Sequence, residues 1–330
     1  SQQYKNPNEV QGVLADGDTV EIEAGNYNDI TVWTKNNIII KGVGSRPHFS
    51  ANGVNIPNQK AIWVIQGDNC IVDNIEFSGA DVSSNNGAGI RSEGINLTVN
   101  NSYFHDNEMG ILTANDERST IIIENTEFHD HGKSNGGMSH NIYIGQCEKF
   151  ILKNSYSHHA WHGHNVKSRA ENNYILYNRI MDEETGSSSY LLDLPEGGRS
   201  YVIGNLFHKG VNAENPNAAI SYASENLNGE FQELYVSGNT FVNERSNGGG
   251  IRYVNGDPKL KIVNNIFLDF TSPMNSDATA QEYYNNIEST SSSELNFEDL
   301  NNFDYSLDEN SIAIDIGVNL GIEEGFDLTP

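Results

Sequence analysis

The segment TVNNSYF at residues 98–104 decides the fold, because variants of it recur along most of the chain. Each copy is a short apolar run that ends in Asn and is followed within three residues by a bulky side chain. The copies are IVDNIEF (71–77), TVNNSYF (98–104), IIENTEF (122–128), ILKNSYS (151–157), ILYNRIM (175–181), VIGNLFH (202–208), VSGNTFV (236–242) and IVNNIFL (262–268). Successive copies begin 24 to 34 residues apart, which indicates a repeat architecture.

A second short apolar segment lies between successive copies. These segments are GIRS (89–92), GILT (110–113), NIYIG (141–145), NVKS (165–168), LLDL (191–194), AISY (219–222) and GIRY (250–253). Short runs rich in Ile and Val, without a helical period, indicate β-strands. Because they recur in the same order and direction, each strand should pair in parallel with its copy one coil later. The sequence therefore predicts an all-β fold, a single-stranded right-handed parallel β-helix of about ten coils.

The recurring Asn has a physical role in such a coil. Asn tolerates the left-handed backbone conformation of a corner, and its amide can bond the Asn of the next coil. We expect one ladder formed by Asn74, Asn101, Asn125, Asn154, Asn178, Asn205, Asn239 and Asn265. The aromatic side chains that follow should stack inside the coils, and they are Phe77, Phe104, Phe128, Phe207, Phe241 and Phe267.

Both ends of the chain are predicted to differ from the coils. Residues 6–15 have the pattern of a short helix, with Asn6 as N-cap and Pro7 at the first position. Val10, Val13 and Leu14 would form its apolar stripe. We expect a single domain over 1–330, with a cap over 1–15, coils over 16–271 and a C-terminal cover over 272–330.

The charge balance limits the partners. The chain has 19 Lys and Arg against 45 Asp and Glu, a net charge of −26, which argues against nucleic acid or an anionic membrane. No apolar run approaches the roughly 18 residues of a membrane span. We interpret the N-terminal SQQYKNP, which has no signal peptide, as the start of a processed, secreted or periplasmic protein. Cys70 and Cys147 should lie about three coils apart, as separate thiols.

Strand alternation predicts one outward column of side chains. Its members are Arg91, Leu112, Tyr143, Lys167, Asp193, Ser221 and Arg252. Two observations set the register between Tyr143 and Lys167. The segment HNIYI (140–144) matches HNVKS (164–168), and Tyr143 and Lys167 each precede an Asn of the repeat by 11 residues. Tyr143 and Lys167 should therefore lie on adjacent coils, with Cα atoms about 4.8 Å apart.

Basic and imidazole groups are scarce elsewhere but gather around this pair. An outward Lys is ordinarily only solvated, yet HHAWHGH (158–164) holds four of the ten histidines. We predict a site with Tyr143 and Lys167 as catalytic residues. The predicted substrate-binding residues are Arg91, His140, Asn141, His162, His164, Asn165, Arg169 and Arg199.

Other chemistry for this region stays open. His162 and His164 alternate on one strand and could chelate a transition metal. Calcium could bind the carboxylates of residues 182–184, although such a run is ordinarily a solvated loop. Asp193 and Glu196 are the best pair for glycoside hydrolysis. We expect no cofactor and leave calcium open.

The coils, the N-terminal helix and the segment HNVKSRAENNYILYNRI (164–180) resemble the right-handed β-helix polysaccharide lyases that act on alginate and related uronates, families 31 and 6. In family 6 a lysine in an N-x-K-S setting is the base, and the matching residue is Lys167. The arginine that acts as the acid in that family lies in an L-R-H-G-N-R run on the next coil. This chain has LLDLPEGGR there, so that arginine is absent, although Arg199 matches the second arginine of the run. Family 31 is similar but pairs a tyrosine with a lysine, which fits Tyr143 and Lys167.

The resemblance implies β-elimination on an acidic polysaccharide, first of all alginate or polymannuronate. One of Tyr143 and Lys167 would be the base and the other the acid, with Arg169, Arg199 and protonated histidines supplying positive charge and Arg199 and the histidines binding the carboxylate. The alternatives are a mannuronan epimerase or a glycoside hydrolase on the same fold, or a non-catalytic carbohydrate-binding β-helix. The D-P-H motif of the β-helix epimerases is absent from the sequence. We expect a monomer.

Overall fold

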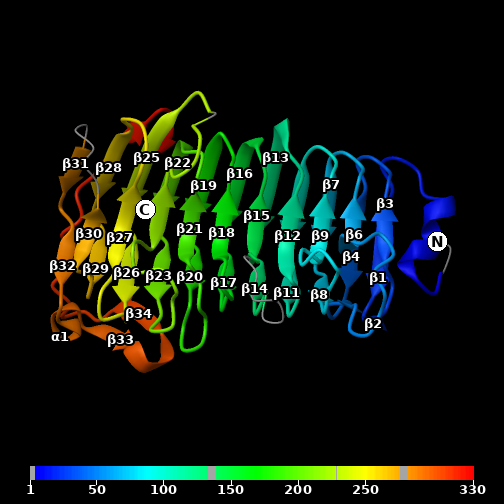
Figure 1. The fold of residues 1–330 in the computed structure, drawn as a ribbon, viewed down its shortest axis with the longest axis horizontal. Coiled ribbons are helices and arrows are strands. Elements are labelled where there is room, and N and C mark those ends of the chain that lie inside the picture. The colour runs from blue at the N-terminus through cyan, green and yellow to red at the C-terminus, as the bar shows by residue number, and fades with distance from the viewer. Residues whose placement is uncertain (1–3, 133–138, 228, 276–280) are drawn as a thin grey trace.

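The computed structural model describes residues 4–132, 139–227, 229–275 and 281–330. In this part of the chain, strands assemble into three long parallel sheets that wind around one axis (Figure 1). Every third strand joins the same sheet, so each coil contributes one strand to each wall. The predicted right-handed parallel β-helix is confirmed, with eleven strands in each of two sheets and ten in the third.

Sheet A is built from the apolar runs of the repeat. Its strands in spatial order are β1 (Thr19–Glu23), β4 (Ile39–Val43), β7 (Cys70–Asp73), β10 (Leu97–Asn100), β13 (Asp116–Glu124), β16 (Cys147–Lys153), β19 (Asn172–Leu176), β22 (Gly198–Ile203), β25 (Gln232–Ser237), β28 (Lys259–Val263) and β31 (Gln281–Tyr284).

Sheet B follows after the Asn corner and carries the aromatic position. Its strands are β2 (Asn26–Tyr27), β5 (His48–Ser50), β8 (Glu76–Ser78), β11 (Tyr103–His105), β14 (Glu127–His129), β17 (Tyr156–His158), β20 (Arg179–Met181), β23 (Leu206–Lys209), β26 (Thr240–Asn243), β29 (Ile266–Leu268) and β32 (Ile287–Ser289).

Sheet C contains the second predicted strand of each coil. Its strands are β3 (Thr31–Trp33), β6 (Ala61–Ile65), β9 (Ala88–Ser92), β12 (Met109–Thr113), β15 (Ile142–Ile144), β18 (His164–Ser168), β21 (Tyr190–Leu194), β24 (Ile220–Tyr222), β27 (Gly249–Tyr253) and β30 (Ser272–Asn275).

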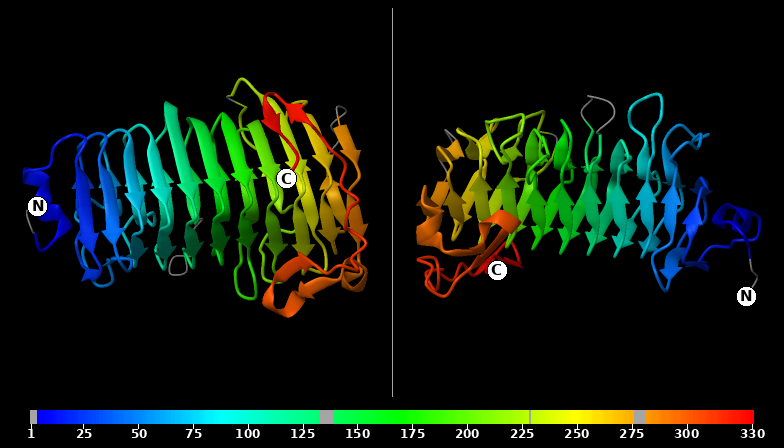
Figure 2. Two further views of the ribbon diagram at one scale, coloured as in Figure 1. Left: turned by 180° about the vertical axis from the view of Figure 1, so that it is seen from behind. Right: turned by 90° about the horizontal axis from the view of Figure 1, so that it is seen from below.

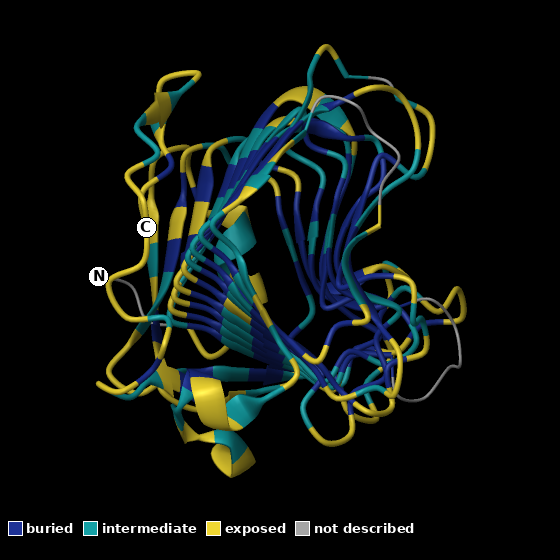
Figure 3. Cartoon of the chain, turned by 90° about the vertical axis from the view of Figure 1, so that its left-hand side faces the viewer, coloured by how far each residue is buried: buried dark blue, intermediate teal, exposed yellow. Residues whose placement is uncertain are grey.

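The interior between the three walls is buried along the whole solenoid (Figure 3). All six predicted aromatic side chains are inside it, but they form two stacks. Phe77, Phe104 and Phe128 stack with centroids 4.8–4.9 Å apart. The second stack, from Phe207 to Phe267, has spacings of 4.7–4.8 Å. Ser157 and Ile180 occupy the same position between the stacks, so the aromatic column is interrupted in the middle coils.

The predicted single Asn ladder is wrong, because it mixes two adjacent columns. Asn74, Asn101, Asn125 and Asn154 occupy the left-handed corner, with φ of 47–58°. Lys153 pairs with Leu176, so the corner position after Asn154 belongs to Tyr177, and Asn178 lies one residue further along. The amide ladder is bonded side chain to side chain at 2.9–3.0 Å and consists of the buried Asn178, Asn205, Asn239 and Asn265 and the half-buried Asn286.

The N-terminal cap is smaller than predicted. The helix is a 3₁₀ helix, η1 (Pro7–Gly12), and Asn6 at its N-cap makes no side-chain capping bond. Leu14 is buried and Val10 packs on the core, whereas Val13 is 62% exposed, so the predicted apolar stripe loses one member. The helix ends at Gly12, and Val13 is its C-cap residue with φ of −123° and ψ of −11°, so the helical period used in the prediction does not extend to Val13. Residues 1–3 of the predicted cap lie outside the described residues.

The coils end later than predicted. Strands β30, β31 and β32 continue the three sheets beyond residue 271, as far as Ser289. The chain then folds back along the outside through α1 (Ser292–Leu295), β33 (Phe297–Asp299), η2 (Leu300–Asn302), β34 (Asp304–Leu307), β35 (Ile322–Glu323) and β36 (Phe326–Asp327) (Figure 2).

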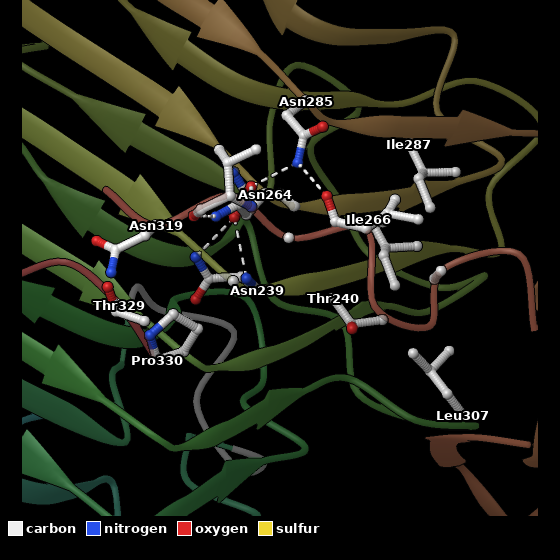
Figure 4. Close-up of a pocket in the computed structure, with 16 residues that line it drawn as sticks. Asn239, Thr240, Asn264, Ile266, Asn285, Ile287, Leu307, Asn319, Thr329 and Pro330 are labelled. Carbon is white, nitrogen blue, oxygen red and sulfur yellow. Dashed lines mark hydrogen bonds between the residues drawn. The ribbon is translucent and has the colours of Figure 1, made fainter. Parts of the chain in front are cut away.

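This returning segment packs on outer faces of sheets A and B. Leu295 and Tyr305 join a buried cluster with Met181 and Val242, and Phe326 packs on Tyr201 with ring centroids 4.7 Å apart. A cavity of about 480 Å³ lies under the segment, beside Asn239, Asn264 and Asn285 (Figure 4). Its lining contains no strand of sheet C among the described residues.

Two further observations concern the cysteines and the helices. Cys70 and Cys147 are free and buried, as predicted, and burial raises the pKa of the two thiols to about 11 and about 12. Within the described ranges, none of the helices has the length and apolar character needed to cross a membrane.

Candidate functional site

The predicted outward column of sheet C is present in the predicted register. Backbone pairing places Tyr143 opposite Lys167, and Lys167 opposite Asp193. The pairing continues without a slip from Arg91 through Leu112 on one side and to Ser221 and Arg252 on the other. The neighbours Ile142 and Val166 are fully buried, so Tyr143 and Lys167 point outward from β15 and β18. The phenol and the amine therefore share one wall on adjacent coils.

Lys167 is held between two carboxylates. Its Nζ lies 3.1 Å from Asp193 Oδ2 and 3.4 Å from Glu225 Oε1. Asp193 is almost fully buried, and burial raises the pKa of its carboxyl group, although the charge of Lys167 opposes that shift. The lysine side chain is only 12% exposed, so the ammonium group has a defined position.

Arg169 connects the phenol of Tyr143 to the carboxylate of Glu225. Its Nε donates to Tyr143 Oη at 3.2 Å, and its Nη2 lies 2.9 Å from Glu225 Oε2. Glu196 Oε1 is 3.6 Å from the same Nε. Arg169 Nη1 is buried and has no hydrogen-bond partner among the described residues. The two N–H donors of this nitrogen thus remain for a further acceptor.

Two imidazoles border the pair on its other side, and both are neutral. The backbone N–H of His164 donates to His140 Nδ1 at 3.0 Å, and that of Tyr190 donates to His164 Nδ1 at 3.2 Å. Each ring therefore carries its proton on Nε2, and His164 Nε2 lies 3.4 Å from Asp193 Oδ2. Burial lowers the pKa of His164 to about 3 and that of His140 well below its usual value. The expectation that protonated histidines supply positive charge here is wrong.

Asn141 and Asn165 do not belong to the outward face. Both are fully buried, and Asn141 Nδ2 donates to Asn165 Oδ1 at 3.1 Å. Ser157 Oγ and Asp182 Oδ1 complete the network inside the coil. Because both amides are enclosed inside the coil, their predicted contact with a substrate is wrong.

Arg199 and His162 are also separated from the pair. Arg199 lies on β22 of sheet A, where it bonds Glu233 at 2.7 and 3.3 Å and covers the ring of Phe231. It therefore belongs to a different wall from Lys167. His162 is in the left-handed region, with φ of 63°, and its Nδ1 bonds Glu214. Arg91 remains in the column, two coils before Tyr143.

The metal and hydrolase alternatives do not assemble at this face. His162 is bonded to Glu214 and His164 faces Asp193, so the two do not form a chelate. Asp182 is fully buried and accepts the backbone N–H of Ser188, which removes it from a calcium loop. Asp193 contacts Lys167 and His164, while Glu196 accepts from Gln146 Nε2 at 2.8 Å, so both carboxylates of the proposed hydrolase pair have structural partners.

Glu225 is the residue that the sequence did not reveal. It is 58 positions from Lys167, on the loop between sheets C and A, and its side chain is 46% exposed. No repeat or motif marks it, because loops between coils vary in length. Its negative charge and its position two residues after a left-handed corner at Ala223 were the available signals.

Comparison with known proteins finds similarity in structure but not in sequence. No protein-family model matches the chain, and no curated protein matches it in sequence. The structure is similar to pectate lyase Pel9A, with a TM-score of 0.62 and 13% identity over 97% of this chain and 89% of that one.

Two further similar structures are more distant. One is alginate lyase AlyF-OU02 in complex with G6, with a TM-score of 0.46 and 16% identity over 85% of this chain and 59% of that one. The other is the GH136 lacto-N-biosidase from Eubacterium ramulus, with a TM-score of 0.41 and 14% identity over 85% and 63%. At these identities the likeness concerns the β-helix fold alone.

Proposed function

We propose that this chain is a polysaccharide lyase that cleaves a uronate-containing polysaccharide by β-elimination, with Tyr143 and Lys167 as its acid–base pair. One observation supports the proposal above the others. Lys167 and Arg169 share a single carboxylate, that of Glu225, directly beside the oxygen of Tyr143. A pair of cations that holds a protein carboxylate in this position can hold the carboxylate of a uronate there.

The reaction needs such a carboxylate clamp. A base removes the proton at C5 of the uronate, the electron pair forms the C4=C5 double bond, and the C4–O bond breaks as an acid protonates the leaving oxygen. The C5 proton is acidic enough only when the charge of the adjacent carboxylate is neutralised in the transition state. Arg169 can provide this neutralisation, and its buried Nη1 offers a further N–H donor.

The two proton-transfer roles follow from the neighbours. Tyr143 Oη accepts a hydrogen bond from Arg169, so the phenol oxygen has the polarity of a group that takes a proton. Lys167 donates to Asp193 and Glu225, so its ammonium group has protons to give. We therefore propose Tyr143 as the base and Lys167 as the acid, with His140 and His164 as neutral donors that border the sugar.

The substrate class rests on the sequence resemblance. Tyr143 with Lys167 matches the pairing of family 31, which makes alginate or polymannuronate the first polymer to test. Pectate is the natural comparison, since Pel9A is a pectate lyase on the same fold. The elimination needs no cofactor in this proposal, and a polymer of this size would be met by a secreted or periplasmic enzyme, which we expect to be a monomer.

The test is a comparison of products. The full chain is incubated with polymannuronate, polyguluronate, pectate and glucuronan, and the ultraviolet absorbance of the new double bond is followed together with reducing ends. Rising absorbance with one of these polymers is the expected result. Reducing ends without absorbance would mean a hydrolase, a changed ratio of mannuronate to guluronate without chain cleavage would mean an epimerase, and retention on the polymer without any product would mean a binding module. Each of these three results would overturn the proposal.

A further inference from the structure

A second group of polar side chains lies on another wall, the outer face of sheet B, near the N-terminal end. His48, Glu76 and His105 come from the consecutive strands β5, β8 and β11. Their ligand atoms lie within 4.8 Å of one another, and each side chain is 17–25% exposed. This group shares no residue with the face that carries Tyr143 and Lys167.

The hydrogen bonds of His48 fix which nitrogen carries its proton. Its Nε2 lies 2.7 Å from Ser78 Oγ, and the Ser78 hydroxyl donates to Ser50 Oγ at 3.5 Å. Ser78 therefore accepts the Nε2–H of His48. The lone pair of Nδ1 then faces Glu76 Oε1 at 3.6 Å.

The same reasoning applies to His105. Its Nδ1 lies 2.8 Å from Asp106 Oδ2, which is the shorter of the two carboxylate contacts of the ring, so a neutral imidazole carries its proton on Nδ1. The lone pair of Nε2 then faces Glu76 Oε1 at 3.2 Å. Two imidazole lone pairs are thus directed at one carboxylate oxygen.

Three acceptors that converge without a donor repel one another, and a cation between them removes the repulsion. A metal ion satisfies all three acceptors together. Two imidazoles and one carboxylate, with a fourth position open, form a donor set that zinc uses in proteins.

The outer contacts agree with this interpretation. Metal-binding histidines ordinarily donate their second N–H to a carboxylate or another protein acceptor, and Asp106 and Ser78 have these roles here. The other group of this kind in the described residues, His158, His159 and Glu183, differs in one respect. His158 Nδ1 and His159 Nδ1 bond each other, so those nitrogens are satisfied without an ion.

We propose that His48 Nδ1, Glu76 and His105 Nε2 bind a divalent transition-metal ion, with Zn²⁺ as the ion that this donor set favours. The ion would connect three successive coils of sheet B. Its role would be structural, apart from the elimination proposed for sheet C.

The test uses Zn²⁺ alone and the full chain. In calorimetric titration we expect one site that Glu76→Gln and His105→Gln each weaken at least a hundredfold. Asp106→Asn, which changes only an outer contact, should weaken it about tenfold. His129→Gln is the matched control, because His129 stacks on His105 but offers no nitrogen to Glu76, and it should bind as the wild type does.

A second measurement covers variants that fail to fold. In wild-type protein labelled with ¹⁵N-histidine, Zn²⁺ should shift the Nδ1 signal of His48 and the Nε2 signal of His105, and leave both nitrogens of His129 unchanged. Zn²⁺ should also raise the melting temperature of the wild type but not that of Glu76→Gln. Equal affinity in wild type and Glu76→Gln, or unchanged signals of His48 and His105, would overturn the proposal.

Discussion

The coils of Phe77, Phe104 and Phe128 and the coils of Tyr143 and Lys167 repeat the same backbone with different contents. In the first stretch the interior is an aromatic stack, and the outer column of sheet C is largely apolar, with Val64 and Leu112 in one buried cluster. In the second stretch the interior contains a polar network of Asn141, Ser157, Asn165 and Asp182 beside apolar core residues, and the outer column is charged.

This difference suggests a division between the two stretches: the aromatic coils contribute mainly to stability, and the polar coils carry the proposed site. Parallel pairing on both sides holds the backbone of the middle coils in register with the flanking coils. The middle coils can therefore hold buried polar groups and an exposed charged face, while the flanking aromatic stacks supply apolar burial. Substitutions in the two stretches should have correspondingly different effects.

The largest effect on stability is expected in the aromatic stretch. Phe104→Ala removes a fully buried ring from between Phe77 and Phe128 and should lower the free energy of unfolding by about 3–5 kcal/mol. Denaturant unfolding followed by circular dichroism measures it. A loss below about 1 kcal/mol would mean that the stack does not carry the stability of these coils.

A pH effect of intermediate size is expected from His164 in the polar stretch. Burial lowers its folded pKa to about 3 from the unfolded value of 6.5, so its contribution to stability is complete above pH 6.5 and is lost as pH falls from there toward 3. Between pH 7 and pH 5 the wild type should lose about 2 kcal/mol more than His164→Gln. Parallel pH curves for the two proteins would show that His164 is not buried in its neutral form.

A smaller loss is expected from the buried amide of the same stretch. Asn165→Ala should cost about 1 kcal/mol, the low end for a broken buried hydrogen bond, because Asn141 Nδ2 keeps Ser157 Oγ and the carbonyl of His158 as acceptors. Urea unfolding of this variant beside Phe104→Ala gives the contrast directly. Equal losses in the two variants would erase the distinction between the stretches.

The smallest effect concerns the carboxylate that occupies the clamp. Glu225→Gln removes a partly exposed charge that competes with a uronate for Lys167 and Arg169, so KM should fall by about fivefold or less. Glu184→Gln, which removes an exposed carboxylate on another loop, is the control for general charge and should leave KM unchanged. A higher KM in Glu225→Gln would instead make Glu225 a contact for the substrate.

The sequence predicted the fold and the central pair because both depend on local repetition. The flanks HNIYI and HNVKS set the pairing of Tyr143 with Lys167 correctly. The second argument, the equal distance to Asn154 and Asn178, was a coincidence, since Asn178 pairs with Ser155 and not with Asn154. The coil of Lys167 has one residue fewer between sheets C and A than the coil of Tyr143, and this difference makes the two distances equal.

What the sequence did not predict depends on corners and loops. Asn165 and Val166 are both buried although they are consecutive residues of β18, which strand alternation does not predict. The place of Arg199 on sheet A depends on where the chain turns from sheet C to sheet A. Glu225 reaches Lys167 from a loop, and the neutral state of His164 follows from burial by side chains of other coils. These features require the three-dimensional packing.

The most direct test of the account is the elimination rate of Tyr143→Phe and Lys167→Ala on the polymer that the wild type cleaves, beside Arg199→Ala. We expect each of the first two to lower kcat by about 10²–10⁴, with the circular dichroism spectrum retained, and Arg199→Ala on the neighbouring wall to keep the wild-type rate. Wild-type turnover in either Tyr143→Phe or Lys167→Ala would contradict it.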